Sequence, residues 1–160
     1  MRGLSDQLAD RMHFSPACSI HPIDSDGNCQ WKALSWACFG DTHHHVQIRN
    51  RVCNEIRTHW SHYKDFVVNA DTYVHEMSKI GTWGDHCTLV AFCNVYDQHL
   101  LVMRNNQEPI MVQPASTNTD VKASQWIVVV YNQVANHYNS VYPYYASPTG
   151  LFLGKVRKTI

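Results

Sequence analysis

The hydrophobic pattern of the chain changes its period once, near residue 100, and this change constrains the fold more than any other feature. Before it, apolar residues recur every three or four positions, as on the buried face of a helix; Ile48, Val52, Ile56 and Trp60 form the clearest stripe. After it come short runs rich in β-branched and aromatic residues, of which 126–131 is the strongest. Helices followed by strands predict an α+β fold in which helices cover a small β-sheet.

Local signals set the expected boundaries of these elements. The predicted helices are 29–38, one capped by Asp41 or Thr42, one starting at Asp71, and one capped at Gly84–Asp85. The predicted strands are 100–103, 110–112 and 126–131, with a turn over 105–109 and an extended segment over 18–23. The unbroken apolar character of 126–131 further predicts a strand that is buried on both faces.

The length of 160 residues favours a single domain. We expect this domain to occupy 1–160, with its core at about 18–142 and a coil-rich tail at 143–160. A content of 44% hydrophobic and 16% charged residues is typical of a globular protein. The formal net charge of zero gives no electrostatic reason to expect nucleic acid or an anionic membrane as a partner. No apolar run approaches the roughly 20 residues that span a bilayer.

The six cysteines are compatible with three disulfides or with free thiols. Cys38, Cys53 and Cys93 occupy apolar positions of predicted helices, where a free thiol acts as a small hydrophobic side chain. The N-terminus lacks the charged-then-apolar order of a secretory signal. We therefore expect a reduced protein in the cytoplasm, or in a host cytosol if the source is a virus or pathogen.

Two groups of residues invite a metal hypothesis. Residues 43–45 are three consecutive histidines, which cannot all face one ion from a helix, and no Cys-x-x-Cys completes a site. His86, Cys87, Cys93 and His99 form a second set, but Cys93 is expected on a buried helical stripe. The sequence therefore predicts no metal ion and no cofactor.

Residues that suit nucleophilic catalysis occur at two distant places. Asp26-Gly27-Asn28-Cys29 reads as a tight turn that places Cys29 in the first turn of a helix. Unpaired N–H groups and the helix dipole at such a place favour a thiolate and supply donors for an oxyanion. Far downstream, His137 and Asn139 complete a Cys…His…Asn pattern. From the residues alone, a structural thiol, a loop histidine and turn-forming Asn139 and Asp26 stay open as alternatives.

Three segments together resemble the ovarian-tumour (OTU) family of cysteine proteases. The segment 26–29, followed by Ala33-Leu34-Ser35, resembles the nucleophile motif of that family. The segment 81–85, Gly-Thr-Trp-Gly-Asp, resembles its central Gly-x-Trp-Gly segment, and 127–131 leading to His137-Tyr138-Asn139 resembles its last strand and His-Tyr-(Asn/Asp) motif. The likeness covers about 18–142 in the family's order.

This resemblance implies a papain-like OTU fold and a monomeric deubiquitinase that needs no cofactor and acts on ubiquitin or polyubiquitin. It implies Cys29 as the nucleophile, His137 as the base, Asn139 as the residue that orients the histidine, and Asp26 as the aspartate of the oxyanion loop, whose N–H groups at 26–29 are the candidate donors. The chain departs from the family at Gln30-Trp31-Lys32, where an aromatic residue and an arginine are usual. It also carries Asn139 where many members have Asp, so Asp24 or Asp26 is a candidate to assist the histidine.

Two alternatives to a deubiquitinase remain. The same chemistry would serve a protease for a ubiquitin-like modifier or for a viral or mobile-element polyprotein, and the fold would also suit an inactive ubiquitin-binding module. Ubiquitin ends in two glycines, so its tail needs a narrow cleft. Candidate walls of that cleft, each equally suited to the core, are Trp31, Trp83, Tyr138 and Tyr142.

Overall fold

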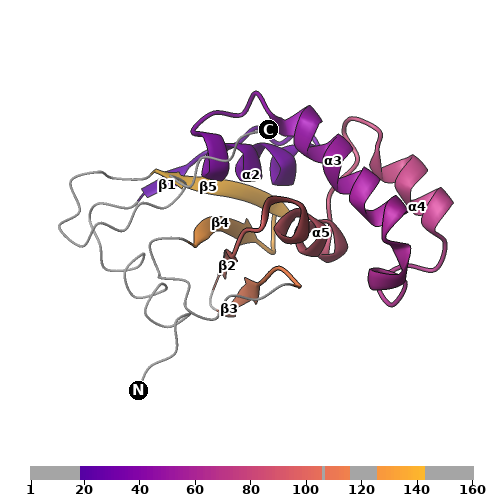
Figure 1. Cartoon of the computed structure of the whole chain (residues 1–160). Helices are drawn as coiled ribbons and strands as arrows, with labels where there is room; N and C mark the ends of the chain where they lie inside the picture. Colours follow the sequence, from indigo (N-terminus) through magenta and orange to yellow (C-terminus); the bar gives the residue numbers. More distant parts are fainter. Residues whose placement is uncertain (1–18, 106, 116–125, 143–160) are drawn as a thin grey trace, which may run out of the picture.

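The computed structural model describes residues 19–105, 107–115 and 126–142, and its helices precede most of its strands (Figure 1). The α-helices are α2 (Cys29–Phe39), α3 (His45–Thr58), α4 (Ala70–Met77) and α5 (His86–Tyr96), and a short 3-10 helix, η1, covers Trp60–His62. The strands are β1 (Ser19–His21), β2 (Leu100–Arg104), β3 (Gln107–Val112), β4 (Ile127–Asn132) and β5 (His137–Tyr142). The predicted α+β class is confirmed.

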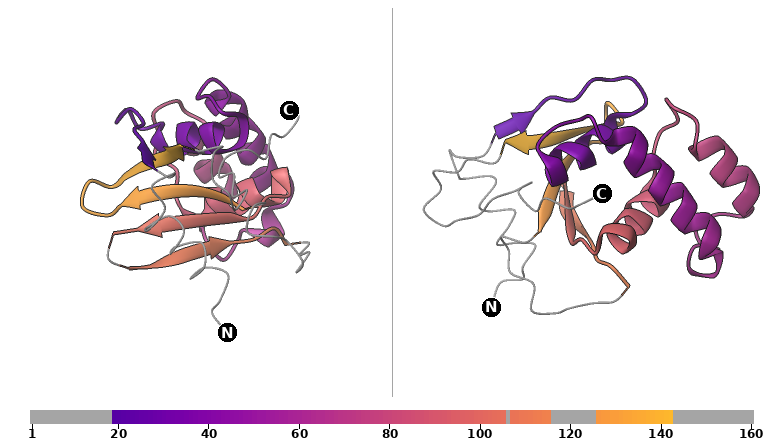
Figure 2. Two further views of the ribbon diagram at one scale, coloured as in Figure 1. Left: turned by 90° about the vertical axis from the view of Figure 1, so that its left-hand side faces the viewer. Right: turned by 45° about the horizontal axis from the view of Figure 1, so that its top comes forward.

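The five strands form one sheet in the order β1-β5-β4-β2-β3. Strands β2 and β4 pair in parallel, and the other neighbours pair antiparallel. The helices gather on one side of this sheet, as the left view of Figure 2 shows. Helix α2 packs against β5 and β4. The Asp26–Cys29 segment, at the start of α2, therefore lies next to the last strand of the described chain.

The hydrophobic core lies between the helices and the sheet, where the periodic stripes predicted it. Trp31, Leu34 and Cys38 of α2 are fully buried, and so are the three aliphatic residues of the α3 stripe. Helix α3 ends before the fourth member of that stripe, Trp60, which begins η1. In β4, Val128 is as completely buried as its neighbours Ile127 and Val129, so the predicted burial on both faces is confirmed for the first half of the run, whereas Val130 and Tyr131 are only partly buried.

Two of the predicted helix starts are wrong. Helix α3 has no side-chain cap, because Asp41 uses its carboxylate to accept from the backbone N–H of His43, at 2.9 Å. Helix α4 is capped by Asn69 rather than started at Asp71, since the extended backbone of Asn69 aims its side chain at the N–H of Thr72. The predicted cap at Asp85 is confirmed, and it forms a reciprocal capping box with Thr88.

The strands also extend beyond the apolar runs that predicted them. Strand β3 begins at Gln107, so the predicted turn over 105–109 is too long; Pro109 is tolerated because β3 is an edge strand. The polar segment 137–142 forms β5, because backbone pairing with β1 and β4 stabilises an extended conformation that its composition alone does not predict. The proposed tail at 143–160 and Cys18 lie outside the described residues.

The remaining cysteines, Cys29, Cys38, Cys53, Cys87 and Cys93, are all free thiols. In the part of the chain that the structure describes, no helix combines the length and the apolar composition that crossing a bilayer requires.

Candidate active site

The fold brings Cys29 against β5. The backbone N–H of Tyr138 donates to the Cys29 sulfur, with 3.5 Å between nitrogen and sulfur. Cys29 is the first residue of α2, so its own N–H has no acceptor within the helix. Its side chain is 7% exposed, at the edge of a surface crevice. The two neighbours of Tyr138 in the strand are His137 and Asn139, so the two distant motifs meet at this sulfur.

His137 is held by two oxygen acceptors on one side of its ring. Its Nε2 lies 3.1 Å from Oδ1 of Asn139 and 2.9 Å from the carbonyl oxygen of Ile23. The Ile23 N–H donates to the same Asn139 oxygen, at 2.9 Å, which assigns the orientation of the amide. Because Nε2 faces only acceptors, it carries the proton of the neutral ring, and Nδ1 is left as the basic nitrogen.

Ile23 is a functional residue that the sequence did not reveal. It follows β1, which pairs with β5 and so leads the chain past His137. Both of its contacts to the site are made by backbone atoms. A backbone contact leaves no signature in the amino-acid type, and only the pairing of β1 with β5 would have indicated it. Ser25, two residues later, places its hydroxyl 3.4 Å from Nδ1 of His137.

Asp26 shapes the turn rather than contacting His137. One carboxylate oxygen accepts from the N–H of Asn28 at 3.0 Å, and the other pairs with the Lys32 ammonium, which also lies 3.5 Å from Asp24. Desolvation raises the pKa of Asp26, but the Lys32 ammonium and the Asn28 N–H outweigh it and hold that pKa below its ordinary value. Both acidic residues that were candidates to assist the histidine thus pair with Lys32, while Asn139 contacts the ring.

The same contacts narrow the set of oxyanion donors. Among the N–H groups of 26–29, that of Asn28 is already bonded to Asp26. The N–H groups of Asp26, Gly27 and Cys29 remain candidates, and that of Cys29 lies at the start of α2, next to the sulfur. One such donor contributes about 2.7–4 kcal/mol to transition-state stabilisation in proteases.

A narrow crevice leads to Cys29. Its lining consists of Cys29, Gln30, Trp83, Gly84, Asn136 and Tyr138. Four of these residues also line an adjacent cavity of about 450 Å³, which extends over β2 and β4. Trp83 is 53% exposed at the junction, whereas Trp31 is fully buried in the core and forms no wall. The side chain of Tyr142 lies outside the described atoms.

Gln30, one of the departures from the family pattern, links α2 to the start of α5. Its side-chain N–H donates to the carbonyl of Asp85 at 3.1 Å, and its oxygen accepts from the Thr88 hydroxyl at 2.7 Å. A Cβ at Gly84 would lie only 2.0 Å from that oxygen, which explains the glycine at this position. Gln30 therefore fixes one wall of the crevice relative to the nucleophile.

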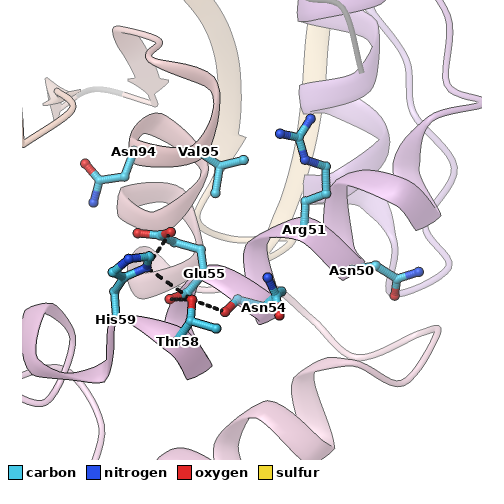
Figure 3. A pocket seen from close by; sticks show the side chains of 8 residues that line it. All are labelled: Asn50, Arg51, Asn54, Glu55, Thr58, His59, Asn94 and Val95. Carbon is cyan, nitrogen blue, oxygen red and sulfur yellow. Dashed lines mark hydrogen bonds and ion pairs between the residues drawn. The ribbon is translucent and has the colours of Figure 1, made fainter.

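A separate groove of about 550 Å³ lies between α3 and α5 and shares no residue with the crevice. Figure 3 shows its polar lining, in which Nδ1 of His59 lies 2.9 Å from a carboxylate oxygen of Glu55. Across the described ranges, no three His, Cys, Asp or Glu side chains are arranged to hold a metal ion. Of the three consecutive histidines, His44 pairs with Asp41 at 3.0 Å.

Comparison with known proteins agrees with this geometry. Residues 24–142 match the family model of the OTU-like cysteine proteases. The chain is 27% identical over 143 residues to OVARIAN TUMOR DOMAIN-containing deubiquitinating enzyme 12 of Arabidopsis thaliana, covering 89% of this chain and 64% of that enzyme. It is 29% identical over 126 residues to enzyme 9 of the same series, covering 76% of this chain and 34% of that protein. The chain thus spans less than two thirds of either relative.

Solved structures share the fold. The OTU domain of OTUD1 superposes with a TM-score of 0.72 at 16% identity, over 86% of this chain and 94% of that one. An ovarian tumor (OTU) domain solved in complex with ubiquitin gives a TM-score of 0.67 at 17% identity, over 83% of this chain and 78% of that one. The family match spans the thiol, the histidine and the asparagine. The chain belongs to the OTU-like cysteine protease family.

Proposed function

We propose that this protein is a cysteine-type deubiquitinase, which hydrolyses isopeptide bonds at the ubiquitin C-terminus through a thioester on Cys29. The observation that carries the proposal is the meeting of the Cys29 thiol with the His137–Asn139 strand at the end of a narrow crevice. Relatives named as deubiquitinating enzymes and an OTU domain solved with ubiquitin support this choice of substrate.

In the proposed hydrolysis each of these groups has a role in acyl transfer. His137 Nδ1 takes the thiol proton, and the sulfur of Cys29 attacks the carbonyl carbon of the last ubiquitin glycine. The N–H of Cys29 donates to the oxyanion that forms. The imidazolium then gives its proton to the departing lysine amine, which leaves a thioester. His137 next deprotonates a water molecule that attacks the thioester, so ubiquitin leaves with a free carboxylate and the thiol is regenerated.

The shape of the crevice supports a substrate with a slender end. Its lining includes Gly84, the exposed ring of Trp83 and Tyr138. A diglycine tail has no side chains to clash with these walls. The adjacent cavity, lined in part by Leu89, Val102 and Ile110, offers an apolar surface to whatever precedes or follows the cleaved bond.

We also propose that the catalytic unit is one domain with its core at about 18–142, since the described helices and strands share one hydrophobic cluster. A reducing, cytoplasmic compartment suits this unit because its mechanism needs a free Cys29. Subcellular fractionation, followed by titration of the Cys29 thiol in the recovered protein, tests this localisation.

Activity-based probes test the proposed function and its alternatives. Ubiquitin carrying a C-terminal propargylamide should attach to the wild-type protein and leave Cys29→Ala unlabelled, and di-ubiquitin should be cleaved. Labelling by a ubiquitin-like modifier probe in place of ubiquitin would reassign the substrate. Ubiquitin binding with no labelling by any probe would show an inactive binding module.

A further inference from the structure

Arg49 is a fully buried cation that no carboxylate pairs with at close range in the described structure. Its guanidinium donates to the carbonyl oxygens of Met77 and Thr82 at 2.8 and 2.9 Å and to the side-chain oxygen of Asn28 at 2.8 Å. It also lies 4.6 Å from the ring centroid of Trp31. Burial lowers the pKa of Arg49, although arginine keeps its charge in proteins. An apolar side chain of similar volume would cost less to bury, so stability alone does not account for this residue.

The contact with Asn28 has a consequence for the start of α2. Asn28 is the N-cap residue of that helix, and a side chain there ordinarily accepts from the second or third N–H of the helix. Asn69 and Asp85 do so for α4 and α5. Asn28 does not, because its oxygen accepts instead from Arg49 and from the N–H of Gly81, both at 2.8 Å.

We propose that Arg49 is a positioning residue for the hydrolytic reaction: it holds the Asn28 side chain away from the N-terminus of α2, so that the N–H groups beside Cys29 stay available to the oxyanion. Both lone pairs of the Asn28 oxygen are occupied by donors on the inner side of the turn. Without Arg49, only the Gly81 N–H holds this oxygen, and the amide can rotate to cap its own helix. Its oxygen would then occupy the space in front of the Cys29 N–H. This inference rests on the proposed hydrolysis at Cys29.

Substitutions at both ends of the contact test the proposal. Arg49→Met should lower kcat at least about tenfold, as loss of an oxyanion donor does, and leave KM within about twofold. Arg49→Lys should fall in between, since one ammonium cannot reach all three oxygens. Val52→Ala, one turn along α3 and equally buried, is the control: it should lower the unfolding temperature and leave kcat unchanged.

The double variant separates positioning from structural support. In an Asn28→Ala background there is no amide to swing onto the helix, so adding Arg49→Met should leave kcat at the value of Asn28→Ala alone. A kcat in the double variant equal to the product of the two single losses would overturn the proposal. Arg49→Lys and Arg49→Met variants that fold and keep the kcat of Val52→Ala would overturn it as well. If Arg49→Met does not fold, Arg49→Lys combined with Asn28→Ala completes the same double-mutant cycle.

A readout without ubiquitin keeps this test distinct from that of the proposed function. Amide hydrogen exchange at Gln30 and Trp31, the second and third residues of α2, should slow severalfold in the Arg49 variants as Asn28 begins to cap them. Unchanged or faster exchange at both positions would contradict the proposed rotation, whether or not the wild-type protein cleaves ubiquitin. Failure of the wild-type protein to cleave any modifier would reject only the proposed function.

Discussion

The backbone N–H of Tyr138 points at the sulfur of Cys29, with 3.5 Å between the two atoms. Side chains alternate along a strand, so His137 and Asn139 lie on the face opposite to that of Tyr138, while its N–H lies in the plane of the sheet. One strand, β5, therefore carries the histidine, the amide that orients it and a donor to the nucleophile. A shift of β5 by one residue would disrupt all three relationships.

Removal of the Cys29 thiol should abolish turnover while leaving ubiquitin binding intact. We expect Cys29→Ala to lower kcat by at least about 10⁴-fold, because no other group in the crevice can form the acyl intermediate. Cleavage of di-ubiquitin and binding by calorimetry measure the two effects. Cys38→Ala, two turns along the same helix and buried in the core, is the matched control and should retain activity. Residual cleavage by purified Cys29→Ala would show that the nucleophile is elsewhere.

Loss of His137 should cost more activity than loss of Asn139. His137→Ala removes the proton carrier and should lower kcat by about 10²–10⁴-fold. Asn139→Ala should cost less, because the carbonyl of Ile23 still accepts from Nε2 at 2.9 Å and keeps the same tautomer. Asn139→Asp retains the acceptor oxygen and should keep most of the activity. Equal and total loss in both alanine variants would make Asn139 indispensable.

The turn before Cys29 should tolerate no side chain at Gly27. This residue has φ +78°, and a Cβ there would lie 2.1 Å from the carbonyl oxygen of Gly81. Gly81 also has a positive φ, +91°, but a Cβ there would lie 4.0 Å from its nearest neighbour. Gly81→Ala should therefore cost only about 1–2 kcal/mol of left-handed strain, and Gly27→Ala should cost more and lower activity as well. Denaturant unfolding of both variants measures the difference; equal costs would show that the turn moves aside.

The Asp26–Lys32 pair should contribute to stability above the acid range and lose that contribution as the pH falls. The folded pKa of Asp26 is lowered from the ordinary value of 3.8, so the unfolded chain takes up a proton at a higher pH than the folded protein does. The free energy of unfolding therefore falls as the pH drops below about 4. The carboxylate is 39% exposed, which screens the effect. Lys32→Met should raise the Asp26 pKa and shift acid unfolding to higher pH. An unchanged carboxylate titration by NMR in Lys32→Met would contradict this assignment.

Much of the fold follows from local signals. In α2, α3 and α5, the apolar stripes and the capping box depend on residues three or four positions apart. The apolar run of β4 predicts burial from its composition alone, whichever strands it pairs with. Both wrong helix starts come from a competing local contact: Asp41 accepts from the N–H of His43 instead of capping α3, and the Asn69 side chain caps α4, which begins one residue before the predicted start. A tertiary contact overrides a local preference at Asn28, whose side chain contacts Arg49 instead of capping α2.

The sequence by itself determined that a glycine-containing turn presents Cys29 at the start of a helix and that His137 and Asn139 follow a buried strand, because turn chemistry and periodicity are local. Only the tertiary structure decided that the Ile23 backbone shares in holding His137, that Asp26 is engaged by Lys32, and that buried Arg49 contacts the nucleophile turn. The contacts of Ile23 and Arg49 join separate segments through sheet pairing and helix packing, and the Asp26–Lys32 pair forms because the turn and the first turn of α2 bring the two side chains together. Backbone acceptors and buried amides leave no periodic pattern, so no local signal encodes them.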